Sequence, residues 1–510
     1  MNFDNQFIEY LQTNIFPTYF NSCRWFAGKA KAQKSFEIQH IIPFGNSYIL
    51  IVAVYYEDHS IERYQLPITY KNSADELSEK AIVDSSSTPY LIDAIYDADF
   101  RQQLYEGIYH QITHLPNITF ERGDGLNLAD IPNHIDSRVL PVDSSNSAMI
   151  FGNKYFLKLY RKLFDQTNPE VEMVSFLTQH SQFRNIPAYT GSIAWQAHEA
   201  APEITLGMMQ QALSTNKDNW VLTGDYLNDF MYGIPNSMFA IHENVFEQVA
   251  LLGKRTGEMH LGLYAPQANE AFSPESFNDF YRQFLINRLT HLLNDRYDLL
   301  IENYSKLDIP TQRLAWIFME ARELIEEFAQ DMLTRPIESK RIRIHGDYHL
   351  GQVLTENGDF IIIDFEGEPE ATIADRKIKH SPLKDVAGMI RSYHYAVSAK
   401  LFESAETKEI SAEKLQMVSD RWYKLIQQTY LEAYLEVFGL PHPLFTSQNE
   451  LNFLLLFFLL EKAFYELGYE ISYRPSWVKI PLRGIVEVIR EIEKIKEPSV
   501  RISRLGGGYC

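Results

Sequence analysis

The chain has 510 residues, of which 45% are hydrophobic and 22% charged, as in ordinary globular proteins. This length predicts two to four packed domains, and the composition excludes a collagen, a disordered polymer and a disulfide scaffold. The 47 basic and 67 acidic residues give a net charge of −20. Such a charge argues against a surface that binds nucleic acid or anionic lipid, so we expect no nucleic-acid partner and no membrane partner.

The cysteines and the apolar runs favour a cytoplasmic protein. Cys23 and Cys510 lie at opposite ends of the sequence and form neither a disulfide framework nor a zinc ligand set. The most apolar run, Phe453 to Leu460, has eight residues, whereas a bilayer span needs about 20. The N-terminus has no basic segment followed by an apolar one, so it does not resemble a secretory signal.

The hydrophobic spacing changes twice along the chain. Residues 1–135 contain alternating runs typical of strands, and 136–213 read as strands around one helix. Beyond 214 the spacing is mostly helical, with helices expected over 245–263, 277–302, 312–333, 411–438 and 450–469. We therefore predict an α+β protein with a β-rich N-terminal domain (1–135), a small β-rich lobe (136–213) and a helical lobe (214–510).

One short β signal interrupts the helical lobe. The Asn-Gly pair at 357–358, between two apolar runs, predicts a two-residue hairpin turn. If Glu356 faces Asp359, the numbers of paired residues sum to 715. Gln352 and Asp364 then lie next to each other at the open end of the hairpin.

The residues before this hairpin complete a pattern of phosphoryl transfer. Asp347 lies in the sequence His-Gly-Asp-Tyr-His, five residues before Gln352. In kinase sites, a loop aspartate orients the acceptor hydroxyl, while an amide five residues later and an aspartate after a hairpin hold Mg²⁺. We therefore predict Asp347 as the catalytic residue and Gln352 and Asp364 as metal ligands, with His345 as a brace of the loop. The alternative is a hairpin with acids at its solvated ends.

A second hairpin carries the candidate nucleotide site. Gly152-Asn153 predicts a turn in which paired numbers sum to 305, so that Lys158 lies opposite Ser147. A lone lysine on a strand is usually a surface residue, but its order before Asp347 favours a phosphate-binding lysine. The polar turn beside it could donate hydrogen bonds to phosphate, and its candidate residues are Ser144, Ser145, Asn146 and Ser147.

A helix and a connector follow the lysine. Asn168 is the expected N-cap of a helix that begins at Pro169. Glu172 on this helix is the candidate partner of Lys158, and Glu170 is the alternative. The strand that ends near Gln211 leads into the helical half, so Gln211 to Leu213 are candidates for contacts with adenine; an ordinary strand exit is the alternative.

Several strings in the sequence resemble the bacterial maltokinase family, whose members are relatives of the aminoglycoside phosphotransferases with a eukaryotic-kinase-like fold. The most specific are HGDYHLGQVL at 345–354 and IDFEGEP at 363–369. The resemblance implies a bilobal kinase-like fold with an N-terminal cap domain, and ATP and Mg²⁺ as cofactors. It also implies phosphorylation of maltose at the anomeric hydroxyl to give maltose 1-phosphate for α-glucan (glycogen) synthesis. Family members are often fused to trehalose synthase, which implies a functional link to that enzyme. We expect this chain to be a monomer or a dimer. Gln352 replaces the Asn usual in the wider superfamily.

The acceptor sugar is expected in the helical lobe. Lys462, Glu466 and Tyr469 share one helix face and offer an ammonium, a carboxylate and a phenol to a disaccharide. An exposed Lys462–Glu466 ion pair is the alternative. We also assign His349, Glu366 and Arg474 to this site.

Two other functions compete with the maltokinase interpretation. The same fold could phosphorylate another sugar, such as glucosamine or glucose. The chain could also be a pseudokinase that binds a partner or a nucleotide without turnover, although the complete set of Asp347, Gln352, Asp364 and Lys158 argues against this.

Overall fold

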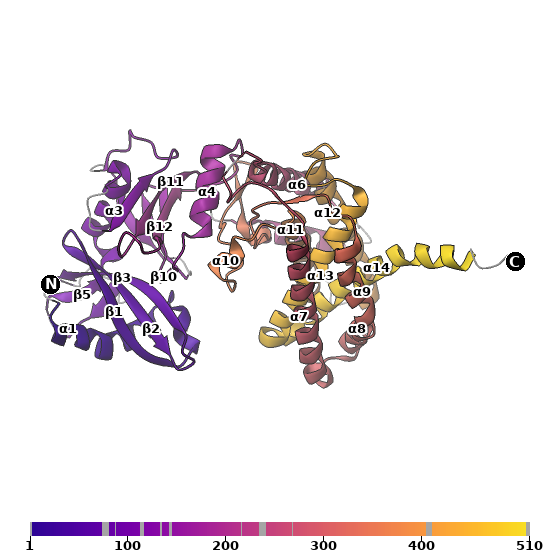
Figure 1. The fold of residues 1–510 in the computed structure, drawn as a ribbon, viewed down its shortest axis with the longest axis horizontal. Coiled ribbons are helices and arrows are strands. Elements are labelled where there is room, and N and C mark those ends of the chain that lie inside the picture. The colour runs from indigo at the N-terminus through magenta and orange to yellow at the C-terminus, as the bar shows by residue number, and fades with distance from the viewer. Residues whose placement is uncertain are drawn as a thin grey trace. The chain divides into compact units, whose positions relative to one another are not determined.

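The computed structural model describes residues 3–73, 81–86, 88–112, 117–132, 135–141, 145–215, 217–233, 241–267, 269–403 and 411–505. The chain divides into two compact units (Figure 1). Unit 1 comprises Met1–Ser214 and Ala371–Ile373, and unit 2 comprises Thr215–Glu370 and Ala374–Cys510. Strands dominate unit 1 and helices dominate unit 2, as the spacing of apolar residues predicts. The protein therefore has the predicted α+β architecture.

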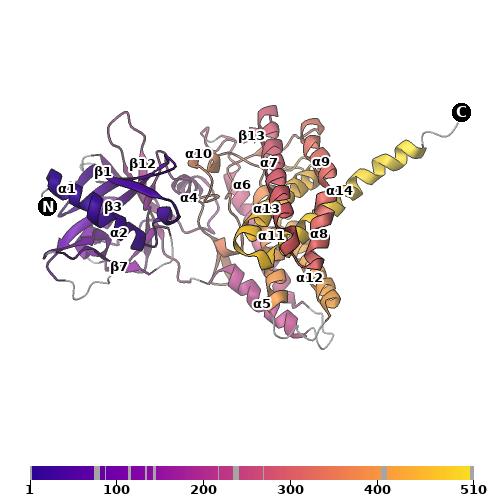
Figure 2. The ribbon, with the colours of Figure 1, turned by 90° about the horizontal axis from the view of Figure 1, so that it is seen from below.

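The first sheet of unit 1 has the strand order β1-β2-β3-β5-β4, with β10 paired to β3. One face of this sheet is covered by α1 and α2, which lie in front of β1 and β3 in Figure 2. Phe16 and Phe20 of α2 pack there against Phe36 and Tyr64 of the sheet. The elements are α1 (Asn5–Tyr10), a π-helix (Leu11–Ile15), α2 (Phe16–Ser22), β1 (Gln33–Phe44), β2 (Ser47–Tyr56), β3 (Ile61–Lys71), β4 (Ile82–Asp84), β5 (Tyr90–Asp93) and β10 (Lys162–Leu163).

The second sheet of unit 1 has the order β6-β11-β12-β9-β8-β7. The expected helix after Asn168 is α4, and the Asn168 side chain accepts a hydrogen bond from the backbone N–H of Glu170 at 2.8 Å, as predicted for an N-cap. The elements are α3 (Ala98–His110), β6 (Ile118–Arg122), β7 (Ser137–Leu140), β8 (Ser147–Phe151), β9 (Tyr155–Leu159), α4 (Pro169–His180), β11 (Tyr189–Trp195) and β12 (Ile204–Gln211).

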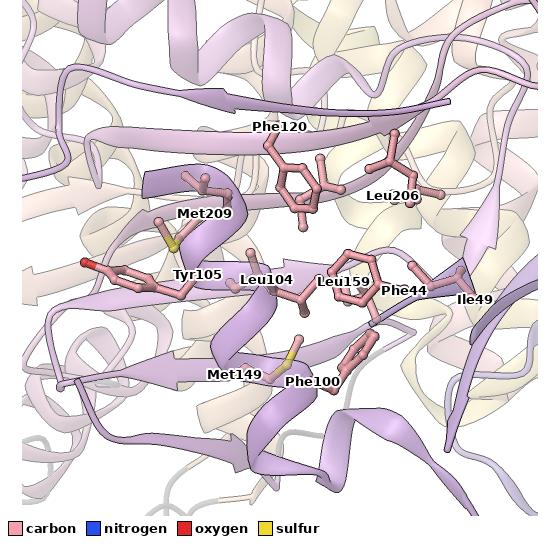
Figure 3. Packing of buried hydrophobic residues seen from close by; sticks show 14 of the residues in the cluster. Phe44, Ile49, Phe100, Leu104, Tyr105, Phe120, Met149, Leu159, Leu206 and Met209 are labelled. Carbon is pink, nitrogen blue, oxygen red and sulfur yellow. The ribbon is translucent and has the colours of Figure 1, made fainter. Parts of the chain in front are cut away.

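The two sheets of unit 1 share one hydrophobic core. Figure 3 shows Phe44 and Ile49 from the first sheet beside Leu159 and Leu206 from the second. Strands also cross between the sheets, because β6 precedes residue 135 yet pairs with β11, and β10 pairs with β3. Residues 1–214 thus form one packed unit, and a domain boundary at residue 135 stays an expectation.

Unit 2 is built from helices around α13, most of whose residues are buried. Figure 1 shows α7 and α13 running close together, and the two helices pack on each other. The elements are α5 (Asn219–Gly233), α6 (Glu243–Leu263), β13 (Glu275–Ser276), α7 (Asp279–Asn303), α8 (Ile309–Glu320), α9 (Arg322–Thr334), β14 (Lys340–Arg341), β15 (Val353–Glu356), β16 (Asp359–Ile362), α11 (Leu383–Glu403), α12 (Ala412–Glu436), α13 (Gln448–Tyr473) and α14 (Lys479–Leu505), with the short α10 (Ile373–Arg376) between β16 and α11. Among the described residues, no helix is long and apolar enough to span a membrane.

The helix predicted over 312–333 is two helices in the structure. α8 and α9 are separated at Ala321, whose ψ of 6° departs from helical geometry. The sequence contains neither proline nor glycine at this point, so the apolar spacing alone predicted a single helix.

The hairpin of β15 and β16 has the predicted register. Glu356 faces Asp359, and the backbone N–H of Ile363 donates to the carbonyl of Gln352 at 3.0 Å. Asn357 and Gly358 both have positive φ, of 52° and 79°, as a type I′ turn requires.

The register predicted for β8 and β9 is wrong by one residue. Phe151 faces Tyr155 across a three-residue loop, so Lys158 lies opposite Ala148 and Ser147 lies opposite Leu159. Because successive side chains on a strand point to opposite faces, the side chains of Ser147 and Lys158 lie on different faces of the sheet.

Candidate active site

In unit 1, the predicted phosphate lysine pairs with a buried carboxylate. Lys158 lies on β9, and its Nζ is 2.8 Å from Oε2 of Glu170, a residue that is 1% exposed. Glu170, the alternative, is thus the partner of Lys158 that the structure describes, and a role of Glu172 in the nucleotide site stays a prediction. Residues two positions apart on an α-helix are separated by about 200° around its axis, so Glu170 and Glu172 cannot both face the sheet.

Two side chains of the polar turn before β8 contact Arg161, and a role of this turn in phosphate binding stays a prediction. Ser144 lies outside the described residues, and Ser145 is exposed. Asn146 accepts a hydrogen bond from the backbone N–H of Arg161 at 3.3 Å, and the hydroxyl of Ser147 accepts one from Nε of Arg161 at 2.7 Å. Ser147 is buried on the face opposite Lys158, so its side chain contributes to the core of unit 1 rather than to the surface beside the lysine.

The connector at the end of β12 is held by backbone hydrogen bonds. The N–H of Gln211 donates to the carbonyl of Ala188 at 2.9 Å, and the N–H of Ala212 donates to that of Lys154 at 2.7 Å. β12 ends at Gln211, and Leu213 follows it, partly buried. This part of unit 1 ends directly after Leu213, at Ser214, and unit 2 begins at Thr215. Contacts of Gln211 and Leu213 with adenine stay a prediction.

In unit 2, the loop that carries Asp347 is braced by a buried carboxylate. Asp385 of α11 accepts the backbone N–H groups of His345 and Gly346 at 2.7 and 2.9 Å, and Nε2 of His260 lies 3.0 Å from the same carboxylate. These contacts, with His260 first, lower the pKa of Asp385 despite its complete burial. The carboxylate therefore stays charged and fixes the start of the loop.

The rest of the loop is held by packing. Nε2 of His345 lies 2.9 Å from the carbonyl oxygen of Ile363, which ties the loop to the hairpin as predicted for a brace. Tyr348 is buried, and its hydroxyl lies 2.9 Å from that of Thr256. A Cβ on Gly388 would meet the carbonyl oxygen of Tyr348 at 2.6 Å, so only glycine allows this approach of α11.

The carboxylate of Asp347 faces two of the predicted acceptor residues. Nζ of Lys462 lies 3.7 Å from Oδ1 of Asp347, and Nε2 of His349 lies 3.9 Å from Oδ2. Burial, together with the charge of Lys462, lowers the pKa of His349 although Asp347 opposes this. His349 is therefore neutral near pH 7, and its Nδ1 accepts the backbone N–H of Gly351 at 3.1 Å.

The predicted metal ligands lie together at the open end of the hairpin. Nε2 of Gln352 donates to Oδ2 of Asp364 at 3.1 Å, which leaves the amide oxygen of Gln352 directed elsewhere. Asp364 has a φ of 67°, a left-handed conformation that Asp tolerates better than most residues. A carboxylate oxygen of Glu366 lies within 4.8 Å of one of Asp364. Glu366, predicted as an acceptor residue, thus lies beside the candidate metal ligands.

A pocket of about 390 Å³ in unit 2 brings the predicted acceptor residues together. Ligand sites of this kind measure about 300 to 1,000 Å³. The pocket is lined by His349, Gly351, Lys462, Glu466, Tyr469 and Arg474, as well as by Asp218, Trp220, Gly388, Ser392, Tyr395, Tyr465, Glu470 and Trp477. Aromatic rings and charged groups thus line one cavity.

The alternative of a Lys462–Glu466 ion pair is wrong in this structure. Lys462 contacts Asp347, whereas Oε2 of Glu466 accepts hydrogen bonds from Nε and Nη2 of Arg391, at 2.9 and 2.6 Å. Arg391 is 2% exposed, so Glu466 neutralises a buried cation. Arg474 pairs with Glu470 at 2.7 Å and lies over the ring of Trp477.

Comparison with known proteins finds a matching domain model and several similar proteins. Residues 19–97 match the maltokinase N-terminal cap domain. A glucosamine kinase from Mycolicibacterium smegmatis is 25% identical over 364 residues, which are 69% of this chain and 80% of that protein. A second glucosamine kinase, from Streptacidiphilus jiangxiensis, is 24% identical over 152 residues, 29% of this chain and only 32% of that protein.

The solved structure of a glucosamine kinase in complex with glucosamine, ADP and inorganic phosphate superposes with a TM-score of 0.67 at 16% identity. The superposition covers 92% of this chain and 98% of that chain, so both units follow the kinase-like fold. The chain thus carries a segment that matches the maltokinase cap domain, and it is similar to glucosamine kinases over most of its length.

The structure also shows site residues that sequence reasoning missed. Ser392 and Tyr395 of α11 line the pocket, and Arg391 of α11 pairs with Glu466. Trp220 of α5 and Asp218, directly before this helix, also line the pocket. The sequence contained a weak indication for Arg391, because an arginine in a buried helix usually has an acidic partner. Nothing in the local sequence indicated that α5 reaches the same pocket.

Proposed function

We propose that the chain is an ATP-dependent kinase that phosphorylates maltose at its anomeric hydroxyl. The observation that carries this proposal is the position of Asp347, on a loop braced by Asp385, beside Lys462 and His349 of the 390 Å³ pocket. A carboxylate held at the edge of a sugar-sized pocket suits the orientation and deprotonation of an acceptor hydroxyl.

The lining of the pocket supports a sugar acceptor. The rings of Trp220, Tyr465 and Trp477 offer apolar faces on which a pyranose ring can stack. Lys462, Glu466 and Arg474 supply donors and acceptors for hydroxyl groups. Because Asp347 lies at the Lys462 side of the pocket, we expect the anomeric hydroxyl there and the second glucose unit toward Arg474.

The nucleotide is assigned to Lys158 and the divalent cation to the hairpin end. The amide oxygen of Gln352 and the carboxylates of Asp364 and Glu366 are hard oxygen donors of the kind that Mg²⁺ prefers. When bound, Mg²⁺ neutralises charge on the transferred phosphoryl group. Lys158, oriented by Glu170, would contact the phosphates, and the ADP complex of the glucosamine kinase supports a nucleotide in this fold.

Two observations favour maltose over glucosamine as the proposed acceptor. Residues 19–97 match the cap domain of maltokinases. In addition, Glu466 and Glu470 of the pocket are already paired with Arg391 and Arg474, so these carboxylates are neutralised and less suited to an ammonium group. Glucosamine is the second candidate, because two similar proteins and the superposed structure are named glucosamine kinases.

Initial rates with a panel of sugars test this proposal. The assay would measure ADP formation with MgATP and maltose, glucosamine, glucose or trehalose, with Asp347→Asn as the inactive control. We expect kcat/KM for maltose to exceed the other values at least tenfold. A higher value for glucosamine would select the second candidate, and no turnover with any sugar would favour a pseudokinase.

A further inference from the structure

A buried glutamine of the cap domain contacts the strand that carries Lys158. Gln65 lies on β3 within the segment that matches the maltokinase cap, and it is 0% exposed. Its Nε2 donates to the carbonyl oxygen of Tyr160 at 2.7 Å and to that of Leu206 at 2.5 Å. Its backbone N–H donates to the carbonyl of Arg161 at 2.9 Å. One cap residue thus fixes the backbone that directly follows β9.

The side chain of Tyr160 extends this contact to the candidate nucleotide site. Tyr160 is 3% exposed, and its hydroxyl donates to Oε2 of Glu170 at 2.8 Å. The same oxygen lies 2.8 Å from Nζ of Lys158. The carboxylate that orients the lysine is therefore itself held by a tyrosine whose backbone is bound to the cap.

Neighbouring residues anchor the same segment to the cap. Arg161 is fully buried, pairs with Asp93 at 2.5 Å and lies over the ring of Trp25. Lys162 pairs with Glu62 at 2.8 Å, and β10 adds to the first sheet beside β3. Removing a partner from a buried pair is costly, so this segment cannot shift without disturbing the cap.

We propose that the cap domain positions the nucleotide-binding lysine, and that Gln65 and Tyr160 are the positioning residues. Gln65 holds the backbone of Tyr160, and the hydroxyl of Tyr160 holds Glu170 in the rotamer that places Lys158. This inference rests on the proposed function in one respect, because it takes Lys158 as a ligand of the ATP phosphates.

The test compares two tyrosine variants of the full chain. Tyr160→Phe removes the hydroxyl that contacts Glu170. The matched control is Tyr189→Phe in β11, since Tyr189 is 0% exposed and its hydroxyl donates to Ser192 at 2.8 Å rather than to Glu170. Calorimetry would give the MgATP affinity, steady-state kinetics the KM values for ATP and acceptor, and urea unfolding the stability.

We expect Tyr160→Phe to weaken MgATP binding about three- to tenfold, the size of one ordinary lost hydrogen bond, with the KM for the acceptor unchanged. Tyr189→Phe should lose similar stability and leave the MgATP affinity unchanged. Gln65→Met, which keeps the side-chain length and removes both donated hydrogen bonds, should reproduce the effect of Tyr160→Phe. If Tyr160→Phe binds MgATP as tightly as Tyr189→Phe, the inference is overturned while the proposed kinase stands. A wild-type protein that does not bind MgATP would overturn both.

Discussion

At the residue scale, substitution of Asp347 tests the proposed chemistry most directly. Its carboxylate lies between Lys462 and His349 at 3.7 and 3.9 Å, at the edge of the acceptor pocket. We predict that Asp347→Asn keeps the fold and the MgATP affinity while kcat falls by about 10² to 10⁴, because a positioned base contributes that much. Unchanged turnover would remove Asp347 from the mechanism, and a parallel loss of MgATP binding would indicate a role at the metal instead.

Glu466 is predicted to stabilise the protein as well as to line the pocket. Its alanine variant would leave Arg391 buried without its counter-ion, at a cost of about 3 to 5 kcal/mol in the free energy of unfolding. Lys462→Ala is the control, since the pair with Asp347 is partly exposed and is worth less than about 1 kcal/mol. Urea unfolding measures both, and equal stability of the two variants would show that Arg391 finds another partner.

Single residues also show where sequence reasoning stops. The sequence could indicate that an acid near the start of α4 pairs with Lys158, because the strand, the helix and their order along the chain could all be predicted. It could not choose between Glu170 and Glu172, since that choice depends on the rotation of α4 against the sheet. The pairing of Glu466 with Arg391 joins residues 75 positions apart and left no local pattern.

At the element scale, the two hairpins differ in how far their turns were predictable. Asn-Gly at 357–358 specifies a two-residue turn, so the register of β15 and β16 and the meeting of Gln352 with Asp364 could be worked out from the sequence. Gly-Asn at 152–153 allows longer loops, and the extra residue, Lys154, shifted every pair of β8 and β9 by one. That shift moved Ser147 to the opposite face from Lys158.

The contact between α11 and the catalytic loop gives a prediction at the same scale. Gly388→Ala should leave the protein folded but lower kcat at least tenfold, because the new Cβ would displace the carbonyl of Tyr348, next to Asp347. The control is Gly224→Ala in α5, where the added Cβ meets only the side chain of Lys400, with Cε at 3.4 Å and Nζ at 3.9 Å. That variant should gain up to about 1 kcal/mol of stability. Normal kcat in Gly388→Ala would show that the loop tolerates displacement.

At the scale of the whole molecule, buried neutral histidines make stability depend on pH. Burial lowers the pKa of His394 and of His380 well below the usual value. The unfolded chain therefore binds more protons than the folded one below about pH 6.5, and stability falls as the pH decreases through this range, by at most about 1.4 kcal/mol per pH unit for each histidine.

Urea unfolding at pH 7.5 and 5.5 measures this dependence. Glu487, whose pKa is raised by burial, acts in the opposite direction, so His394→Gln must be compared with the wild type to isolate one histidine. We predict a smaller loss of stability between the two pH values in the variant. An identical loss in both proteins would mean that His394 is protonated in the folded state.

The central claim, transfer of phosphate from ATP to the anomeric hydroxyl of maltose, concerns both units together. The measurement that tests it most directly is phosphorus NMR of the product formed from maltose, ATP and Mg²⁺. We predict ADP and one phosphomonoester resonance, split by coupling to the anomeric proton of the sugar. A phosphomonoester coupled to the methylene protons of a primary alcohol, or ADP with inorganic phosphate alone, would contradict the account.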